Sequence, residues 1–126
     1  MEINKLDHVN VRTAQLDVMI DWYTRVLGMK SGYRPHFAFP GAWMYAGGQP
    51  CVHLVGTDDN PGAGAEVALK LEHFAFSATG LQAFEAALKR TDEPYRRSQL
   101  AEVGIVQINV WDPDGNHIHI DFPANE

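Results

Sequence analysis

Lys5-Leu6-Asp7-His8-Val9, near the N-terminus, is matched in the second half of the chain by Lys70-Leu71-Glu72-His73-Phe74. Apolar residues follow both motifs at the same spacings. A second pair of matching segments closes the two halves, Val52-His53-Leu54 and Ile118-His119-Ile120. The simplest interpretation is a duplicated structural unit that carries one histidine near its start and one near its end.

Length and composition favour a single domain over residues 1–126. The chain has 126 residues, of which 45% are hydrophobic, and this is enough for one core but short for two independent domains. A net charge of -6 provides no basic surface for nucleic acid or for anionic lipid. The single cysteine and the absence of an apolar secretory segment at the N-terminus indicate a cytoplasmic protein without disulfides.

Residue periodicity predicts the order of elements in the first half. His8, Asn10 and Arg12 alternate with apolar residues, so they lie on one polar face of a strand. Apolar residues then recur at helical spacing between Thr13, a candidate cap, and Gly28, a candidate stop. Three short extended segments complete a βαβββ order, at 29–34, 41–46 and 51–55.

The second half repeats this order. Residues 57–66 have the composition of a surface connector. In the helix that follows the next strand, Thr79 and Gln82 fit a capping box. The predicted fold class is α+β, with two βαβββ modules, about 1–56 and 67–126, whose histidine-bearing sheet faces enclose a shared cleft. The strands of the second module are predicted at 69–77, 95–100, 103–111 and 117–122, with a turn at 112–116.

Four histidines occupy repeat-equivalent positions: His8, His53, His73 and His119. Neutral imidazoles suit zinc, nickel, cobalt, iron(II) or copper, and suit calcium or magnesium poorly. Because none of these ligands is anionic, the full charge of the ion would act on a bound oxygen. A lone histidine on a strand is more often a structural residue, but four at equivalent positions favour a metal site over a metal-free pocket.

Other side chains are predicted to line the same cavity. His117 and Asp121 share the face of His119 and are the candidate catalytic residues, as proton carriers or as partners of a metal-ligating histidine. The alternatives are an exposed strand edge for His117 and a polar strand end for Asp121. The candidate substrate-binding residues are Gln107 and Asn109, which interrupt an apolar strand, Arg12, a possible partner for a carboxylate or phosphate, and Tyr45, in the cavity wall.

Three segments together resemble a known family: Leu6-Asp7-His8-Val9, the helix end at 21–29, and Asp112-Pro113-Asp114-Gly115-Asn116 before the last strand. They are similar to the glyoxalase, bleomycin-resistance and extradiol-dioxygenase superfamily, also called vicinal oxygen chelate proteins. The resemblance covers nearly the whole chain. It implies paired βαβββ modules that form an incomplete barrel around a metal, and a homodimer.

The resemblance places His8 and His73 at the two first-strand ligand positions of the family, where histidine is usual. His53 and His119 occupy the last-strand positions, where the glyoxalase I pattern has glutamates. In glyoxalase I the last glutamate is thought to take the substrate proton. A histidine there serves as a base only when it is off the metal, so glyoxalase activity does not transfer directly.

The resemblance thus implies a metal-dependent enzyme that acts on a small oxygen-chelating substrate. Its cofactor would be a divalent transition metal, with Zn, Ni, Co, Mn and Fe(II) as candidates. Lyase or isomerase chemistry is favoured over an extradiol-type dioxygenase, because four protein ligands leave fewer open positions than three. The rival hypothesis is a non-catalytic protein that binds a small molecule or drug, with aromatic walls formed by Trp43, Tyr45 and Trp111 and by a loop containing Phe37 and Phe39.

Overall fold

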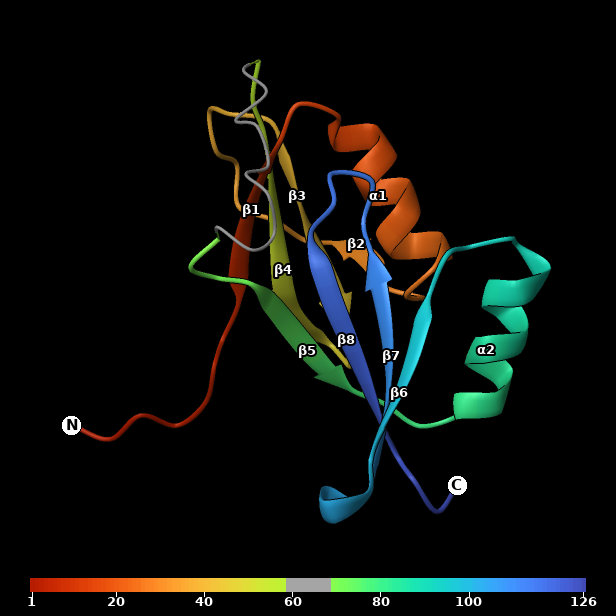
Figure 1. Ribbon diagram of the computed structural model, residues 1–126. Coiled ribbons are helices and arrows are strands. Elements are labelled where there is room, and N and C mark those ends of the chain that lie inside the picture. The colour runs from red at the N-terminus through yellow and green to blue at the C-terminus, as the bar shows by residue number, and fades with distance from the viewer. Residues whose placement is uncertain (59–68) are drawn as a thin grey trace. The chain divides into compact units, whose positions relative to one another are not determined.

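The computed structural model describes residues 1–58 and 69–126 (Figure 1). The chain divides into two compact units, one for each half of the sequence. Most of the predicted connector at 57–66 lies outside the described residues. Its first residue, Thr57, continues from the first unit and donates a backbone hydrogen bond to the carbonyl of Thr13 at 2.8 Å.

The first unit has the predicted βαβββ order. Its four-stranded sheet has the strand order β1-β4-β3-β2, in which β1 runs parallel to β4 and the other neighbours are antiparallel. The helix connects the parallel strand to the rest of the sheet. The elements are β1 (Val9–Thr13), α1 (Leu16–Arg25), β2 (Lys30–Gly32), β3 (Gly41–Ala46) and β4 (Gln49–Gly56).

The second unit repeats this topology, with the strand order β5-β8-β7-β6 and a parallel β5–β8 pair. The α+β fold of two βαβββ modules is therefore confirmed, and neither sheet closes into a barrel within the described residues. The elements are β5 (His73–Ser77), α2 (Leu81–Arg90), β6 (Arg96–Leu100), a short 3₁₀ helix (Ala101–Val103), β7 (Ile105–Trp111) and β8 (His117–Pro123). Both first strands begin later than predicted, so His8 precedes β1 and His73 opens β5.

Each helix covers one face of its own sheet, and the apolar residues of the strands pack beneath it. In the first unit, Met19 and Tyr23 of α1 are fully buried, as are Val52 and Leu54 of β4. In the second, the rings of Phe84 on α2 and Phe122 on β8 lie 5.8 Å apart. Burying a side chain of this size contributes roughly 1.5–3 kcal/mol. This gain fixes which strand face is inside, so the alternate residues, including the histidines, occupy the other face.

The turn before β8 forms as its sequence predicts. Asp112 is buried, and its Oδ1 accepts hydrogen bonds from the backbone N–H groups of Asp114 and Asn116, at 3.0 and 2.9 Å. Gly115 adopts a left-handed conformation with φ of 84°. These contacts fix the point at which β8 starts.

Both predicted helix caps are wrong in detail. The N-cap of α1 is Gln15, whose N–H donates to the Thr13 hydroxyl at 3.0 Å, so Thr13 supports the cap from outside the helix. The N-cap of α2 is Gly80, in a left-handed conformation. Instead of a capping box, Oε2 of Glu126 accepts hydrogen bonds from the N–H groups of Gly80 and Leu81, at 2.9 and 3.1 Å. The carboxylate of Glu126 thus takes the place of a local cap, and its negative charge complements the positive end of the α2 dipole.

Within the described residues, no helix combines the length and apolar character that crossing a bilayer requires.

The substitution Glu126→Ala should destabilise the fold by about 0.5–2 kcal/mol, because two N–H groups of α2 lose their acceptor. Thermal unfolding followed by circular dichroism measures the effect. Glu102→Ala, at an exposed glutamate of the 3₁₀ helix, is the matched control and should leave the melting temperature nearly unchanged. Equal melting temperatures for the two variants would contradict the capping role.

Candidate metal centre

In the first unit, His8 and His53 form a stacked pair on the uncovered sheet face. Their ring centroids are 4.0 Å apart and the ring planes differ by 11°. Parallel pairing of β1 with β4 places Asn10 beside His53, so the two histidines are offset by two residues. Trp43, opposite His53 on β3, stacks on that ring at 4.1 Å. Three rings from three neighbouring segments thus form one column.

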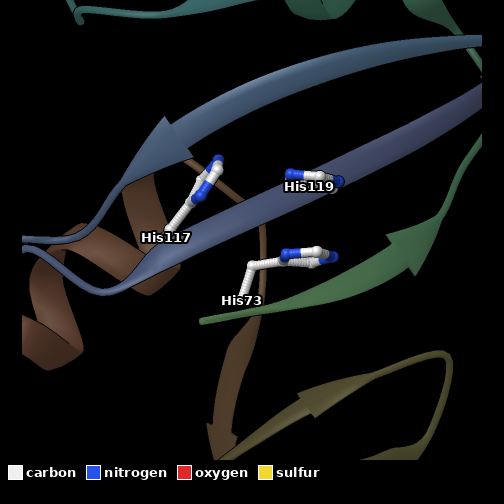
Figure 2. A group of neighbouring side chains, drawn as sticks. All are labelled: His73, His117 and His119. Carbon is white, nitrogen blue, oxygen red and sulfur yellow. The ribbon is translucent and has the colours of Figure 1, made fainter. Parts of the chain in front are cut away.

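The second unit repeats this geometry with His73 and His119 (Figure 2). Their centroids are 3.9 Å apart and the planes differ by 11°. The register is also the same, since Ala75 lies beside His119 in the parallel β5–β8 pair. The duplication seen in the sequence therefore extends to the orientation of the imidazole rings.

A carboxylate lies behind the first histidine of each pair. Oδ2 of Asp7 is 2.7 Å from Nδ1 of His8, and Oε2 of Glu72 is 2.6 Å from Nδ1 of His73. Because a carboxylate only accepts, Nδ1 donates and Nε2 retains its lone pair. This arrangement is common for metal-ligating histidines, because the acceptor fixes the tautomer and the ring orientation. The hydrogen bond from His8 also lowers the pKa of Asp7.

The second histidine of each pair favours the neutral form. Burial lowers the pKa of His53, and the neighbouring His8 lowers it further. Burial likewise lowers the pKa of His119, with additional effects from His73 and His117. Nε2 of His53 donates to the carbonyl of Pro50 at 2.9 Å, which leaves its Nδ1 as the free acceptor. Metal binding requires an unprotonated nitrogen, so these environments suit a metal ligand.

His117 lies beside the second pair but is hydrogen-bonded at both ring nitrogens. It is only 5% exposed. Its Nδ1 lies 3.1 Å from Oε1 of Glu72, and its Nε2 lies 2.9 Å from Oδ1 of Asn109. The amide of Asn109 cannot be reversed, because its Nδ2 donates to the carbonyl of Arg96 at 3.2 Å. Both ring nitrogens of His117 therefore lie next to hydrogen-bond acceptors.

Proximity alone would make His117 a third ligand. One nitrogen from each of His73, His117 and His119 lies within 4.8 Å of the others, and Figure 2 shows the His117 ring tilted beside the parallel rings of His73 and His119. A ring nitrogen that donates a hydrogen bond has no lone pair for a metal. Both nitrogens of His117 are in hydrogen bonds, whereas among the described residues the contacts of His73 and His119 each involve only Nδ1, and this difference separates His117 from the two stacked rings.

Asp121 has the most available carboxylate oxygen on this face. It follows His119 by two residues on β8, and Gln107 is its neighbour on β7. Its Oδ1 is buried and has no hydrogen-bond partner among the described residues. A buried carboxylate oxygen without a donor is costly unless a ligand or a proton satisfies it.

The other predicted site residues divide between the two units. In the second unit, the side-chain nitrogen of Gln107 lies 3.3 Å from Nδ1 of His119, and Asn109 contacts His117. In the first, Arg12 is exposed on the same strand face as Asn10. The ring of Tyr45 packs over Gly32 of β2, and its hydroxyl donates to the carbonyl of Tyr33 at 2.6 Å.

Sequence reasoning missed two contacts. It did not identify Glu72 as the acceptor for two histidines, although an acidic residue precedes the histidine in both copies of the opening motif. It assigned Trp43 to the core or cavity wall, and the structure stacks this ring directly on His53. The first contact had a visible signal in the repeat, whereas the second depends on cross-strand register.

Comparison with known proteins agrees with the fold. The Glyoxalase/Bleomycin resistance protein/Dioxygenase superfamily model matches residues 5–120. Glyoxylase I 4 of Arabidopsis thaliana is 29% identical over 125 residues, which are 95% of this chain and 71% of the relative.

Two solved structures share the fold. The glyoxylase/bleomycin resistance protein/dioxygenase domain from Frankia sp. EAN1pec has a TM-score of 0.80 at 20% identity, over 97% of this chain and 93% of that domain. Lactoylglutathione lyase from Agrobacterium tumefaciens has a TM-score of 0.69 at 13% identity, over 97% and 96% of the two chains. Since the family match spans nearly all of the sequence and the duplicated βαβββ topology accompanies it, the chain belongs to the Glyoxalase/Bleomycin resistance protein/Dioxygenase superfamily.

Proposed function

We propose that this protein is a metal-dependent enzyme of the superfamily that acts on a small substrate with two neighbouring oxygens. The supporting observation is the pair of equivalent histidine stacks, each with a carboxylate on the Nδ1 of its first ring. The imidazoles fit a borderline divalent ion such as Zn, Ni, Co, Mn or Fe(II). In this proposal, the metal-binding imidazoles are those of the two stacked pairs, His8 and His53 in the first unit and His73 and His119 in the second.

The bound ion would supply Lewis acidity toward the substrate oxygens. Asp121 is the better placed of the two predicted proton carriers, because its buried Oδ1 has no partner within the described residues. The nitrogens of His117 are both engaged with acceptors. Asp121 would take a proton from the carbon next to the chelated oxygens, and the amide of Gln107 would orient the substrate.

Lyase or isomerase chemistry is favoured within this proposal, because it needs only a Lewis acid and a proton carrier. Extradiol-type oxygen chemistry needs open positions for both substrate and oxygen, which four histidines restrict. We also infer a cytoplasmic homodimer, in keeping with the superfamily.

A binding or resistance protein is the second candidate, and the loop after β2 favours it. Phe37 and Phe39 are exposed, and their rings stack at 5.1 Å. The guanidinium of Arg34 lies over both rings, at 4.8 and 5.0 Å. Phe37 also approaches Trp43. Such a surface suits a planar organic ligand.

Protein produced without an affinity tag should contain close to one divalent transition metal per site, and a chelator should lower its melting temperature, because an ion that binds only the folded state stabilises it. Elemental analysis and thermal unfolding measure the two effects. Two results would instead favour the binding protein: the metal-stripped protein binds an aromatic ligand tightly, and the chelator leaves the melting temperature unchanged.

Acid should release the metal and destabilise the fold over the same pH range. The pKa values of His53 and His119 in the folded chain lie below their ordinary value of 6.5. The unfolded chain therefore binds more protons, so the contribution of the neutral rings is complete above pH 6.5 and is lost as the pH falls through the folded-state values. Metal content and melting temperature measured from pH 7.5 to about 5 should decline together; a metal content that stays constant over this range would contradict the site.

Asp121→Asn should slow proton abstraction while leaving metal content unchanged. The expected loss in rate is about 10²–10⁴-fold, which is typical when a general base is removed. Deuterium exchange at the carbon beside the carbonyl of small 2-hydroxycarbonyl compounds, followed by NMR, provides the readout. Asp17→Asn, on the exposed surface of α1, is the control. Unchanged exchange in Asp121→Asn would exclude this carboxylate as the base.

A further inference from the structure

The two halves of the candidate site are not equally well supported. Asp7, behind His8, has a side chain that is 72% exposed, and within the described residues its side chain makes one hydrogen bond, to His8. Glu72, behind His73, uses both oxygens: Oε2 accepts from His73 and Oε1 accepts from His117. The second carboxylate is therefore held at two points.

His117 connects Glu72 to a buried polar network. Its Nε2 lies 2.9 Å from Oδ1 of Asn109, which is 1% exposed. Asn109 in turn bonds to the backbone carbonyl and the guanidinium of Arg96, at 3.2 and 3.3 Å. The indole of Trp111 stacks on the His117 ring at 4.8 Å. Residues of β6 and β7 thus hold the His117 ring in place, and this ring in turn fixes the position of the Glu72 carboxylate.

The first unit has no equivalent of this support at the corresponding position. His117 lies directly beside His73 in the β5–β8 register. The alignment of Val52 with Ile118 and of His53 with His119 places Cys51 where the second unit has His117. A thiol is a weak hydrogen-bond donor, so Cys51 offers little to orient the carboxylate of Asp7.

We propose that the second unit is the pre-organised metal-binding unit and takes the ion first, with Glu72 and His117 acting as positioning residues for His73. This inference rests on the proposed metal-dependent function. Side chains already held in the coordinating orientation lose less freedom when the ion binds. His73 and His119 would therefore bind the ion more tightly than His8 and His53.

Titration of Co²⁺ into the metal-stripped protein tests the proposal, with affinity obtained by competition against a chromophoric chelator. Glu72→Gln should weaken Co²⁺ binding roughly 10-fold to 100-fold, the usual effect of removing the acceptor behind a ligating histidine. The matched variant Asp7→Asn should cause a clearly smaller loss, because its carboxylate is exposed. Equal losses in the two variants would overturn the proposal.

The visible spectrum of bound Co²⁺ separates positioning from direct coordination by His117. In His117→Gln, higher Co²⁺ concentrations should restore the wild-type spectrum, because the ligands are unchanged and only the affinity is lower. A different spectrum at saturation would make His117 a ligand and overturn its positioning role. Cys51→Ser, at the equivalent place in the first unit, should leave affinity and spectrum unchanged. Glu72 is about half exposed, at 49%, so Glu72→Gln remains informative even if the buried His117→Gln variant does not fold.

Paired double variants test the order of binding. His8→Ala with His53→Ala should retain a weaker Co²⁺ site, whereas His73→Ala with His119→Ala should lose binding over the same concentration range. Equal residual affinities would contradict a pre-organised second unit. If the wild-type protein itself binds no Co²⁺, Zn²⁺ or Ni²⁺, the proposed function fails as well, and this outcome is distinct from equal losses among the variants.

Discussion

The parallel pairing between the first and last strands of each module is the constraint on which the candidate site depends. β1 pairs with β4, and β5 pairs with β8, in the same register. In each pair, the first histidine lies two residues before the residue that pairs with the second histidine, so both side chains are on the same face. This offset produces the ring stacks, with centroids 4.0 and 3.9 Å apart. A slip of one residue would turn one histidine of a pair toward the helix. The buried apolar residues under each helix therefore also protect the site geometry.

The sequence predicted those features that repetition and alternation determine. The module order, the polar face carrying His53 and His119, and the turn at Asp112 all follow from local patterns, and the structure has each of them. The contacts that it did not predict join residues far apart in the chain. Glu126 caps a helix that begins at Leu81, and Glu72 bonds to His117. Such pairings depend on three-dimensional placement, which no local pattern encodes.

The two modules have diverged in chemistry while keeping the same backbone. On the histidine face, the first module places Trp43 beside His53, and the second places Asn109 beside His119. One face is therefore rich in rings, and the other carries amides and a buried histidine. The two modules keep equivalent ring pairs and differ in what surrounds them. The first has a stacking aromatic ring, and the second has hydrogen-bonded polar groups.

The last strand of each module completes its histidine pair, and this has a consequence for biosynthesis. His53 and His119 lie near the ends of their modules. During synthesis, His8 and His73 are therefore translated well before the histidines with which they stack. A partly made module therefore offers only one imidazole of its pair. The pair forms only after the strand that closes the sheet has been synthesised and has paired with the first strand of its module.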